Sequence, residues 1–510
     1  MENENIKEFS IYTKKALGVK ESYAVIRNTV SLGIDEKEII ENASSAIFFK
    51  MLRSHKNKRI LIVCGNGGKG SIGFGLARRL INYSEVKVAL IGGYESLKPI
   101  NKLNYELFSK ISKVEIVDFG SLNKLKNMIK NSDVIVDAIM GIGMKGRIMG
   151  LDYNVIKMLN ESKKHIVSID LPTGVDADTG TFNRAYIKAD EVFTLYKMKK
   201  GILKNKLIRG TVVVDSGIPF IAELFTGPGD VFLTTEKKDI FSNKFSSGSL
   251  LVIGGSERYQ GAPKLSSFSA KTSLAALRTG AGYVTALVPK KIEEFARKNS
   301  DGIIINAFNN NKKEFLDMVK KIRHRVLVIG PGMENAEGVG VAELLKYESK
   351  AGNTVIIDGG ALKHLGRYKN MLNKNMVITP HEGEFREFSG IDIAKKTFHE
   401  RIKIAINLAK SYNCVVVLKG HITIITNGDL LKINKARTPA LATMGTGDVL
   451  SGIIGAYCAM HKDPFECSTA GVYIHSNIGD KLYETKGNHI IAQDIIDMIP
   501  EFLKDFDVIG

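Results

Sequence analysis

Short apolar runs alternate with amphipathic segments along most of the chain. In the first half, the apolar runs at 59–64, 114–117, 133–137 and 165–170 predict buried parallel strands. In the second half, similar runs occur at 249–253, 283–288, 325–329, 354–358, 376–379 and 414–418. Helical spacing of apolar residues lies between them, for example at 39–52, 74–80 and 269–279. Strands that alternate with helices predict the α/β class, with helices on both faces of a parallel sheet.

The pattern divides into two such series, separated by a stretch around 218–243 that contains the segment FIAELFTGPGD. A chain of 510 residues is long enough for two domains, each with its own core. We therefore predict two three-layer α/β domains, one at 1–218 and one at 239–510, joined by a connector at 219–238.

Composition narrows the class of protein. Hydrophobic residues make up 44% and charged residues 25%, as in soluble globular proteins. The net charge of +18 comes from lysines that are spread along the chain without interleaved aromatic residues, which argues against nucleic acid and suits phosphorylated ligands. The four cysteines form no C-x-x-C pair, and the polar start MENENIKEF resembles no signal peptide. No apolar run is long enough to span a bilayer, so we expect a cytoplasmic protein without membrane or nucleic-acid partners.

Glycine and aspartate follow several strands of the first half. Gly65-x-Gly67-x-x-Gly70 matches the dinucleotide fingerprint, although no clear acidic residue ends the next strand. We interpret this segment as a phosphate-binding loop that precedes a helix at 74–80. Asp137 and Asp170 end two further strands, at the edge where open α/β sheets bind ligands. Each aspartate is also explained by a helix cap.

The segment LATMGTGDVLSGIIGA at 441–456 carries the clearest chemistry. Gly445 and Gly447 predict a tight turn, followed by a helix that begins near Asp448. The helix N-terminus would attract phosphate, and Asp448 would exchange a proton with the reacting group. The alternative is a helix cap behind an ordinary turn. His381, in TPHEGEF after another strand, is a ligand-binding candidate, with a structural histidine as the alternative.

The first half resembles the epimerase domain of the NAD(P)H-hydrate repair enzymes over about residues 10–220. The resemblance rests on DAIMGIGMKGR (137–147), SIDLPTGVDADTG (168–180) and the segment that leads to VVVDSGIP. It implies a Rossmann-like fold and a substrate-binding, catalytic role for Asp170. It also implies a potassium ion bound by Asp137 and Thr173, and a loop for the substrate phosphates made by Gly141, Gly143, Met144, Lys145, Gly146 and Arg147.

One loop departs from this pattern. Where the epimerase family has N-N-G-G-D, this chain has Gly68-Lys69-Gly70-Ser71-Ile72. The domain is therefore either an epimerase with an altered loop or a non-catalytic binding or oligomer-building module. We also hypothesise that the Lys69 ammonium replaces the potassium ion by pairing with Asp137. The alternative places Lys69 in solvent.

The second half resembles the ADP- or ATP-dependent NAD(P)H-hydrate dehydratases of the ribokinase-like superfamily over about 240–505. Five motifs occur in the family's order: GGSxxYxGAP, GPG, TPHxGE, LKG and GTGDVLSG. The resemblance implies Mg²⁺ as a cofactor and Asp448 as catalytic base. It implies substrate contacts from Ala262, Gly332, His381 and Asp448, and adenine-nucleotide contacts from Lys419, Gly420, His421, Ile422, Thr423 and Gly447. Two departures are Asp358-Gly359-Gly360, where Asp-Ala-Asp is usual, and Thr438, where asparagine is usual.

Together the two halves are similar to fused bifunctional repair enzymes. The resemblance implies ADP- or ATP-dependent dehydration of the S form of hydrated NADH or NADPH, epimerisation of the R and S hydrates, and a homo-oligomer. The rival interpretation is a ribokinase-like small-molecule kinase with a non-catalytic N-terminal module. A dehydrogenase built on the first glycine loop is a more distant alternative. A kinase releases a phosphorylated product, whereas a dehydratase releases free phosphate and reduced nicotinamide.

Overall fold

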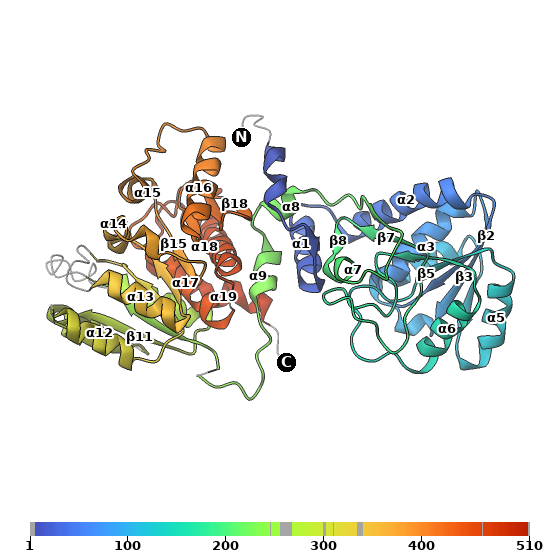
Figure 1. Ribbon diagram of the computed structural model, residues 1–510, viewed down its shortest axis with the longest axis horizontal. Helices are drawn as coiled ribbons and strands as arrows, with labels where there is room; N and C mark the ends of the chain where they lie inside the picture. Colours follow the sequence, from blue (N-terminus) through green and yellow to red (C-terminus); the bar gives the residue numbers. More distant parts are fainter. Residues whose placement is uncertain are drawn as a thin grey trace. The chain divides into compact units, whose positions relative to one another are not determined.

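The chain folds into two compact units, each described here by itself (Figure 1). The computed structural model describes residues 6–244, 246–255, 268–298, 302–309, 311–333, 340–461 and 463–507. Residues 14–219 form one unit, the N-terminal domain. The remaining described residues form the C-terminal domain, including the short helix η1 (Ile6–Tyr12), whose Phe9 lies in that domain's core. The predicted N-terminal domain had included this helix.

The N-terminal domain has a seven-stranded parallel sheet in the order β4-β3-β2-β5-β6-β7-β9. A separate two-residue ladder joins β1 (Ala16–Leu17) to β8 (Met198–Lys199). The Rossmann-like α/β class predicted from the sequence is confirmed. The strands of the sheet are β2 (Arg59–Cys64), β3 (Glu85–Ile91), β4 (Val114–Val117), β5 (Val134–Ala138), β6 (His165–Ile169), β7 (Glu191–Leu195) and β9 (Thr211–Val214).

Helices cover both faces of this sheet, because its central strands are apolar on both sides. Alternate residues of β2 belong to different cores: Ile60 and Ile62 pack with α2, α3 and α4, and Leu61 and Val63 pack with α5 and α6. The helices of the domain are α1 (Val19–Ser31), α2 (Glu36–His55), α3 (Gly68–Leu80), α4 (Pro99–Ser109), α5 (Leu122–Lys130), α6 (Gly150–Glu161) and α7 (Lys200–Lys204).

The glycine segment after β2 differs from the predicted phosphate loop. Helix α3 begins at Gly68 rather than at Phe74, so most of the segment is helical. A Cβ on Gly70 would lie 2.1 Å from the Gly65 carbonyl oxygen, and one on Gly73 would lie 2.7 Å from Ala138 Cβ. These glycines therefore allow close packing of α3 on the sheet, which the sequence pattern cannot distinguish from a loop that binds phosphate.

The C-terminal domain has a nine-stranded sheet in the order β12-β11-β10-β13-β14-β15-β16-β17-β18. The strands up to β16 are parallel, whereas β17 is antiparallel to both of its neighbours. The strands are β10 (Ser249–Ile253), β11 (Tyr283–Pro289), β12 (Ile304–Phe308), β13 (Val326–Ile329), β14 (Thr354–Ile357), β15 (Met376–Ile378), β16 (Val415–Leu418), β17 (Ile422–Thr426) and β18 (Leu431–Lys435).

Two buried clusters again cover the two faces of this sheet. On one face lie α10 (Phe268–Thr279), α17 (Thr446–Met460), α18 (Pro464–Lys486) and α19 (Ala492–Leu503). On the other lie α12 (Lys312–Lys321), α13 (Val341–Ala351), α14 (Gly360–Leu365), α15 (Glu382–Ser389) and α16 (Phe398–Tyr412). A Cβ on Gly452 would lie 2.3 Å from the Thr272 carbonyl oxygen, so this glycine lets α17 approach α10 closely.

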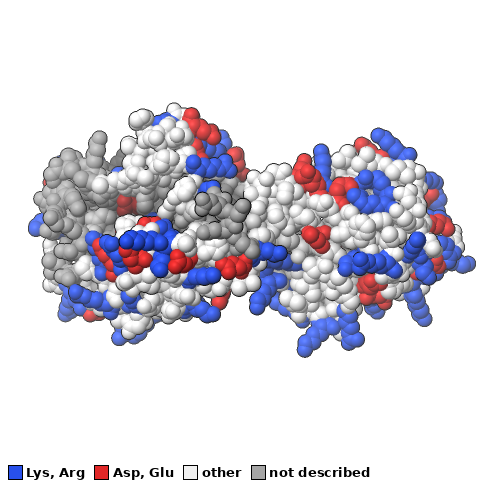
Figure 2. Space-filling model, turned by 90° about the horizontal axis from the view of Figure 1, so that it is seen from above, with Lys and Arg blue, Asp and Glu red and all other residues white. Residues whose placement is uncertain are grey.

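The predicted connector contains ordered structure. Helices α8 (Ile221–Leu224) and α9 (Pro228–Thr234) fall within it, and buried Leu224 and Val231 join the cores of the C-terminal domain. In the described part of the chain, no helix is long and apolar enough to cross a membrane. Figure 2 shows Lys and Arg side chains interspersed with Asp and Glu on the visible face, as expected for evenly spread charge.

Candidate active sites

In the C-terminal domain, Asp448 lies in the first turn of α17, directly behind a glycine turn. The helix begins at Thr446, and its N-cap Gly445 has φ +90°, a conformation that favours glycine. The Thr446 hydroxyl donates to the Leu441 and Thr443 carbonyl oxygens at 2.8 and 2.9 Å, which fixes the turn. The predicted helix start near Asp448 is thus correct to within two residues, and the free N–H groups of this turn are available to a ligand.

A partly buried ion pair connects the ends of β14 and β16, which lie on either side of β15 in the sheet. Lys419, which follows β16, places Nζ 2.8 Å from Asp358 Oδ1, at the end of β14. Ser451 of α17 donates to the other oxygen of Asp358 at 2.7 Å. The Lys419 side chain remains 19% exposed, whereas that of Asp358 is 4% exposed. One face of the ammonium group therefore remains open to a ligand.

These charges tune the acidity of Asp448. Burial and, to a smaller extent, the nearby Asp358 carboxylate raise its pKa to about 7, against the opposing effect of Lys419 and Lys271. Burial also raises the pKa of Asp358, but Lys419 and the hydrogen bonds from Ser451 and Thr379 together lower it below its ordinary value. Asp358 is therefore ionised and Asp448 exchanges its proton near neutral pH, which is the property expected of a general base.

His381 caps helix α15. Its Nδ1 accepts hydrogen bonds from the backbone N–H groups of Gly383 and Glu384 at 3.0 and 3.3 Å. In return, Glu384 Oε2 accepts a hydrogen bond from the His381 backbone N–H at 2.9 Å. The cap fixes the direction of the imidazole, whose Nε2 lies 3.4 Å from Glu384 Oε1, and the side chain remains 59% exposed. A structural role and a ligand-binding role for this histidine are both compatible with the structure, because capping the helix uses only Nδ1 of the ring.

The predicted nucleotide-binding residues form the link from β16 into β17. Thr423 donates to the Gly420 carbonyl oxygen at 3.2 Å, and Gly420 and His421 are exposed. A Cβ on Gly447 would lie 3.4 Å from Lys419 Nζ, so α17 and this link approach each other closely. Nearby, the Thr446 backbone accepts a hydrogen bond from buried His475, and burial lowers the histidine's pKa to about 4.

Three glycines bring the ends of β13 and β14 together. Gly330 has φ +116°, and a Cβ there would lie 1.7 Å from the Asp358 carbonyl oxygen. Gly359 has φ +50° and ψ −132°, a region open to glycine alone, and a Cβ on Gly360 would lie 1.8 Å from the Met333 carbonyl oxygen. The glycines at 359 and 360, where the resemblance would place alanine and aspartate, are therefore required by the close packing of these strand ends. Gly332 lies in the same turn with φ +66°, and Ala262 lies outside the described residues.

In the N-terminal domain, Asp170 follows β6 in a strained conformation with φ +61°. Its Oδ1 lies 2.8 Å from Lys199 Nζ and accepts the Leu195 N–H at 3.0 Å. The side chains of Asp170 and Lys199 are 11% and 3% exposed. These bonds all use Oδ1, and among the described residues none is made to Oδ2. One carboxylate oxygen is therefore held while the other is available for substrate.

Asp137, at the end of β5, lies at the centre of a closed hydrogen-bond network. Its carboxylate accepts from the Ser168 hydroxyl at 2.8 Å, from the Thr173 N–H at 2.9 Å and from the Thr173 hydroxyl at 2.6 Å. Lys69 Nζ lies 2.8 Å from the same carboxylate. The side chains of Lys69 and Asp137 are 3% and 0% exposed, so Lys69 does not point into solvent.

The Lys69 ammonium group fills the place that the resemblance assigned to potassium. Besides Asp137, Nζ reaches the Met140 and Leu171 carbonyl oxygens at 3.2 and 2.7 Å and the Thr173 hydroxyl at 3.2 Å. A potassium ion bound by Asp137 and Thr173 would need these same oxygen atoms. The residues present therefore do not fit an additional cation.

The predicted phosphate loop, 141–147, follows β5. A Cβ on Gly143 would lie 2.5 Å from the Tyr23 hydroxyl oxygen, so this glycine permits a close approach. Asn183 fixes the end of the loop by donating to the Gly146 carbonyl oxygen at 2.8 Å and accepting from the Ile148 N–H at 2.9 Å. Lys145 and Arg147 are exposed and available to phosphate.

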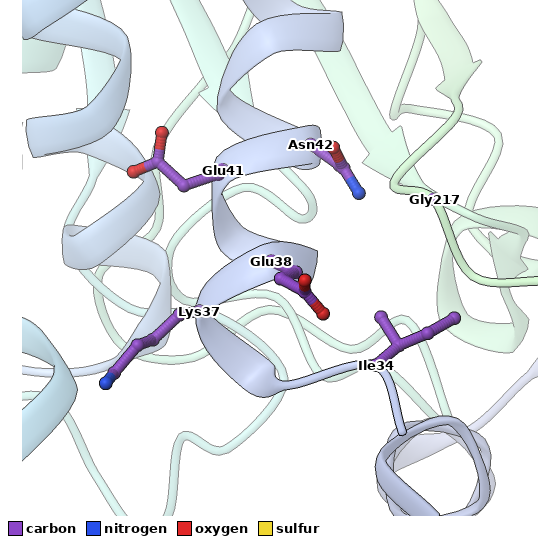
Figure 3. A pocket seen from close by; sticks show the side chains of 6 residues that line it. All are labelled: Ile34, Lys37, Glu38, Glu41, Asn42 and Gly217. Carbon is purple, nitrogen blue, oxygen red and sulfur yellow. The ribbon is translucent and has the colours of Figure 1, made fainter. Parts of the chain in front are cut away.

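A pocket of about 420 Å³ lies elsewhere, at the start of α2 (Figure 3). Glu38 and Asn42 point toward the loop that carries Gly217, whereas Lys37 and Glu41 point to the opposite side. Glu41 is paired with Arg79 at 2.7 Å. None of the predicted site residues lines this pocket.

Sequence reasoning missed several residues around the two aspartates. Lys199 was read only as part of a matching segment, and Lys271 and His475 were not considered. No local motif marks these residues, because each reaches its aspartate or turn from a distant element. Glu384 carried a partial signal, since a glutamate three residues after a helix N-cap is the second half of a capping box, although its usual first residue is serine or threonine and not histidine.

The fold and sites define a two-domain α/β protein in which each sheet carries an aspartate–lysine pair at the carboxyl ends of its strands. Comparison with known proteins identifies its family. Residues 250–501 match the family model described as NAD(P)H-hydrate dehydratase, and residues 36–201 match that of the YjeF-related protein N-terminus. The chain belongs to the family of bifunctional NAD(P)H-hydrate repair enzymes.

Relatives match along nearly the whole chain. The bifunctional NAD(P)H-hydrate repair enzyme of Pyrobaculum aerophilum is 31% identical over 95% of this chain and 97% of its own. That of Archaeoglobus fulgidus is 32% identical over 93% and 95%. Among solved structures, an ADP/ATP-dependent NAD(P)H-hydrate dehydratase from Bacillus subtilis, co-crystallised with ATP/Mg²⁺, is 25% identical with a TM-score of 0.46. It covers 56% of this chain and 99% of its own.

Proposed function

We propose that the C-terminal domain dehydrates the S form of hydrated NADH or NADPH, with ADP or ATP as co-substrate. The observation that carries this proposal is Asp448, a half-buried carboxyl group with a pKa of about 7 in the first turn of a helix. Such a group accepts a proton readily at neutral pH, while the N–H groups of the same turn stabilise negative charge.

The hydroxyl on the hydrated ring is a poor leaving group until it is phosphorylated. Asp448 takes the proton of this hydroxyl as its oxygen attacks the terminal phosphoryl group of the nucleotide. The C6–O bond then breaks with phosphate as the leaving group, a proton passes from C5 to the departing phosphate or to water, and the C5–C6 double bond of the reduced nicotinamide forms. Lys419, held by Asp358, lies beside the developing charge on the phosphoryl group.

The remaining site residues bind the two substrates. The link at Lys419, Gly420, His421, Ile422 and Thr423, together with Gly447, holds the adenine nucleotide, and Gly332, His381 and Ala262 contact the hydrated nicotinamide nucleotide. Carboxylate and phosphate oxygens are the ligands that Mg²⁺ prefers, and the Glu384 carboxylate lies in this site, with Oε2 3.8 Å from Lys419 Nζ and Oε1 3.4 Å from His381 Nε2. Glu384 and the phosphates would hold Mg²⁺, which neutralises phosphate charge when bound.

For the N-terminal domain we propose epimerisation of the R and S hydrates. Oδ2 of Asp170 exchanges a proton with the bound hydrate as the configuration of its hydroxyl-bearing carbon is inverted. Lys199 and the Leu195 N–H hold Oδ1 and keep the side chain in one orientation. Lys145 and Arg147 bind the substrate phosphates. This activity would supply the dehydratase with the S form from a mixture of hydrates.

An assay of the purified protein on each hydrate separately, with ADP and ATP in turn, tests both proposals. We expect the S hydrate to yield free phosphate and reduced nicotinamide. The R hydrate should yield them only through epimerisation, and Asp170→Asn should abolish that second reaction alone. A stable phosphorylated product would instead establish the kinase alternative. No turnover of the R hydrate would leave the N-terminal domain as a binding module.

Crystals soaked with ADP or AMP test the nucleotide site. We expect density for the adenine nucleotide beside Lys419, Thr423 and Gly447. Density at another location, with this link unoccupied, would contradict the assignment. Crystals of the Lys419→Met variant, soaked in the same way, serve as a control, because nucleotide binding should be weaker in this variant.

A further inference from the structure

The surroundings of Lys69 are those of a bound cation rather than of an ordinary ion pair. Four oxygen atoms lie within 3.2 Å of its Nζ: one from the Asp137 carboxylate, one from the Thr173 hydroxyl and two from the carbonyl groups of Met140 and Leu171. Carboxylate, hydroxyl and carbonyl oxygens are the donors that hard metal cations accept. Asp137 lies in β5, and the other three residues lie in the segments that follow β5 and β6.

The same four oxygens connect the two segments that carry the proposed epimerase chemistry. Met140 directly precedes the phosphate loop at 141–147, and Leu171 directly follows Asp170. A single positive charge at this position therefore fixes the phosphate loop relative to the aspartate. Without that charge, Asp137 would be a fully buried carboxylate with no cation beside it.

We propose that the Lys69 ammonium group is a tethered cation that takes the place of a free monovalent ion at this sheet edge. The lysine reaches the oxygens from the first turn of α3, where Gly70 and Gly73 let the helix lie against the sheet. Since the cation is covalently attached, the N-terminal domain is organised at any potassium concentration. The oxygen cage itself retains the capacity to bind a monovalent ion once the lysine side chain is removed.

Two substitutions separate the charge of Lys69 from its volume. Lys69→Asn removes the ammonium group and opens the cage, leaving an amide oxygen near it. Lys69→Met keeps a side chain of similar length, so the cage stays filled but loses its charge. Lys87→Asn is the matched control, because Lys87 is 49% exposed on β3 of the same domain and pairs only with Glu85.

Hydrogen exchange of the full-length chain gives a local readout at 134–148 and 166–176. Each variant is compared in potassium chloride and in tetramethylammonium chloride at the same ionic strength. We expect the unaltered chain and Lys87→Asn to exchange equally in both salts. Lys69→Asn should exchange faster in tetramethylammonium and regain protection saturably with potassium, by mass action. Lys69→Met should exchange faster in both salts.

The proposal fails on either of two results. One is a saturable, potassium-specific protection of these segments in the unaltered chain, which would mean that a free ion still binds there. The other is a Lys69→Asn variant that folds but responds to potassium no more than Lys87→Asn does. If Lys69→Asn does not fold, the salt response of the unaltered chain still decides. A thallium(I) soak of crystals of the unaltered chain is a second test, because anomalous density beside Asp137 would overturn the proposal.

Discussion

Both domains place a lysine against an aspartate at the end of a parallel strand, yet the two pairs differ in what surrounds them. Lys69 and Asp137 are 2.8 Å apart in the N-terminal domain, and Lys419 and Asp358 are 2.8 Å apart in the C-terminal domain. Lys69 uses its donors on three further protein oxygens, and its side chain is 3% exposed. Lys419 is 19% exposed.

The two lysines differ in whether the ammonium group can still contact a ligand. Lys69 has no capacity for a ligand, so its charge organises loops. Lys419 is held by Asp358 on one side, and its other neighbours are the carboxyl groups of Glu384 and Asp448. The same pair of side chains therefore serves as internal support in one domain and as part of a proposed active site in the other. Distance alone does not separate the two roles, whereas exposure and the count of oxygen neighbours do.

The largest expected effect comes from Asp448→Asn. We expect dehydration to fall by about 10²–10⁴-fold, the usual range for loss of a general base. Nucleotide affinity should stay close to that of the unaltered chain, because the asparagine keeps the shape of the first turn of α17. Steady-state release of phosphate, together with calorimetric titration of ADP, measures the two quantities. Turnover equal to that of the unaltered chain would show that Asp448 is a helix-start residue without a catalytic role.

Breaking each lysine–aspartate pair tests the comparison directly. Removing one partner of a buried ion pair typically costs about 3–5 kcal/mol, so Lys69→Met should strongly lower the free energy of unfolding of the N-terminal domain. Lys419→Met should lower that of the C-terminal domain by less, because its site is partly exposed, and should mainly weaken nucleotide binding. Urea unfolding followed by proteolysis and mass spectrometry reports each domain separately. Equal losses of stability in the two domains would contradict the distinction between an internal structural pair in the N-terminal domain and a ligand-binding pair in the C-terminal domain.

The pH dependence of dehydration sharpens the assignment of Asp448. With its pKa at about 7, this group is protonated and unable to accept a proton at lower pH. We therefore expect kcat/KM to fall about tenfold for each pH unit below about 7. A profile that stays flat down to pH 5, with chemistry rate-limiting, would contradict the assignment.

The same shift predicts a stability change of known sign. The pKa of Asp448 in the folded chain is raised above its ordinary 3.8, so the folded state holds this proton more tightly than the unfolded state does. The free energy of unfolding should thus decrease as pH rises from about 4 through about 7. In Asp448→Asn this contribution is absent, so the variant should gain stability relative to the unaltered chain at pH 8 but not at pH 4.

The sequence predicted the elements better than their contacts. Apolar runs predicted the central strands of both sheets, because a strand buried on two faces must be apolar along its length. They did not predict β7, β9, β12, β17 or β18. The motif at 445–448 also gave the start of α17 to within two residues. The glycines at 65–73 were misread, because the same residue type serves a phosphate loop and a tightly packed helix. The partners of the two aspartates, Lys199 and Lys271, depend on tertiary contacts between distant segments, which no local pattern contains.

The last prediction compares two glycines that look alike in sequence, Gly70 in the N-terminal domain and Gly447 in the C-terminal domain. A Cβ on Gly70 would lie 2.1 Å from a backbone oxygen of Gly65, which cannot move aside. We expect Gly70→Ala to destabilise its domain by about 1–3 kcal/mol through overpacking. At Gly447 the nearest atom to a new Cβ is the flexible end of Lys419, at 3.4 Å.

Gly447→Ala should therefore leave the C-terminal domain intact, or stabilise α17 by up to about 1 kcal/mol, because alanine favours the helix. Its cost should appear in nucleotide affinity, since a methyl group beside Lys419 limits how closely phosphate approaches the N–H groups of the turn. Thermal unfolding and ADP titration of both variants measure the contrast. If Gly447→Ala destabilises the fold as much as Gly70→Ala while ADP affinity is unchanged, both glycines serve packing, and the phosphate role of the 445–448 turn is wrong.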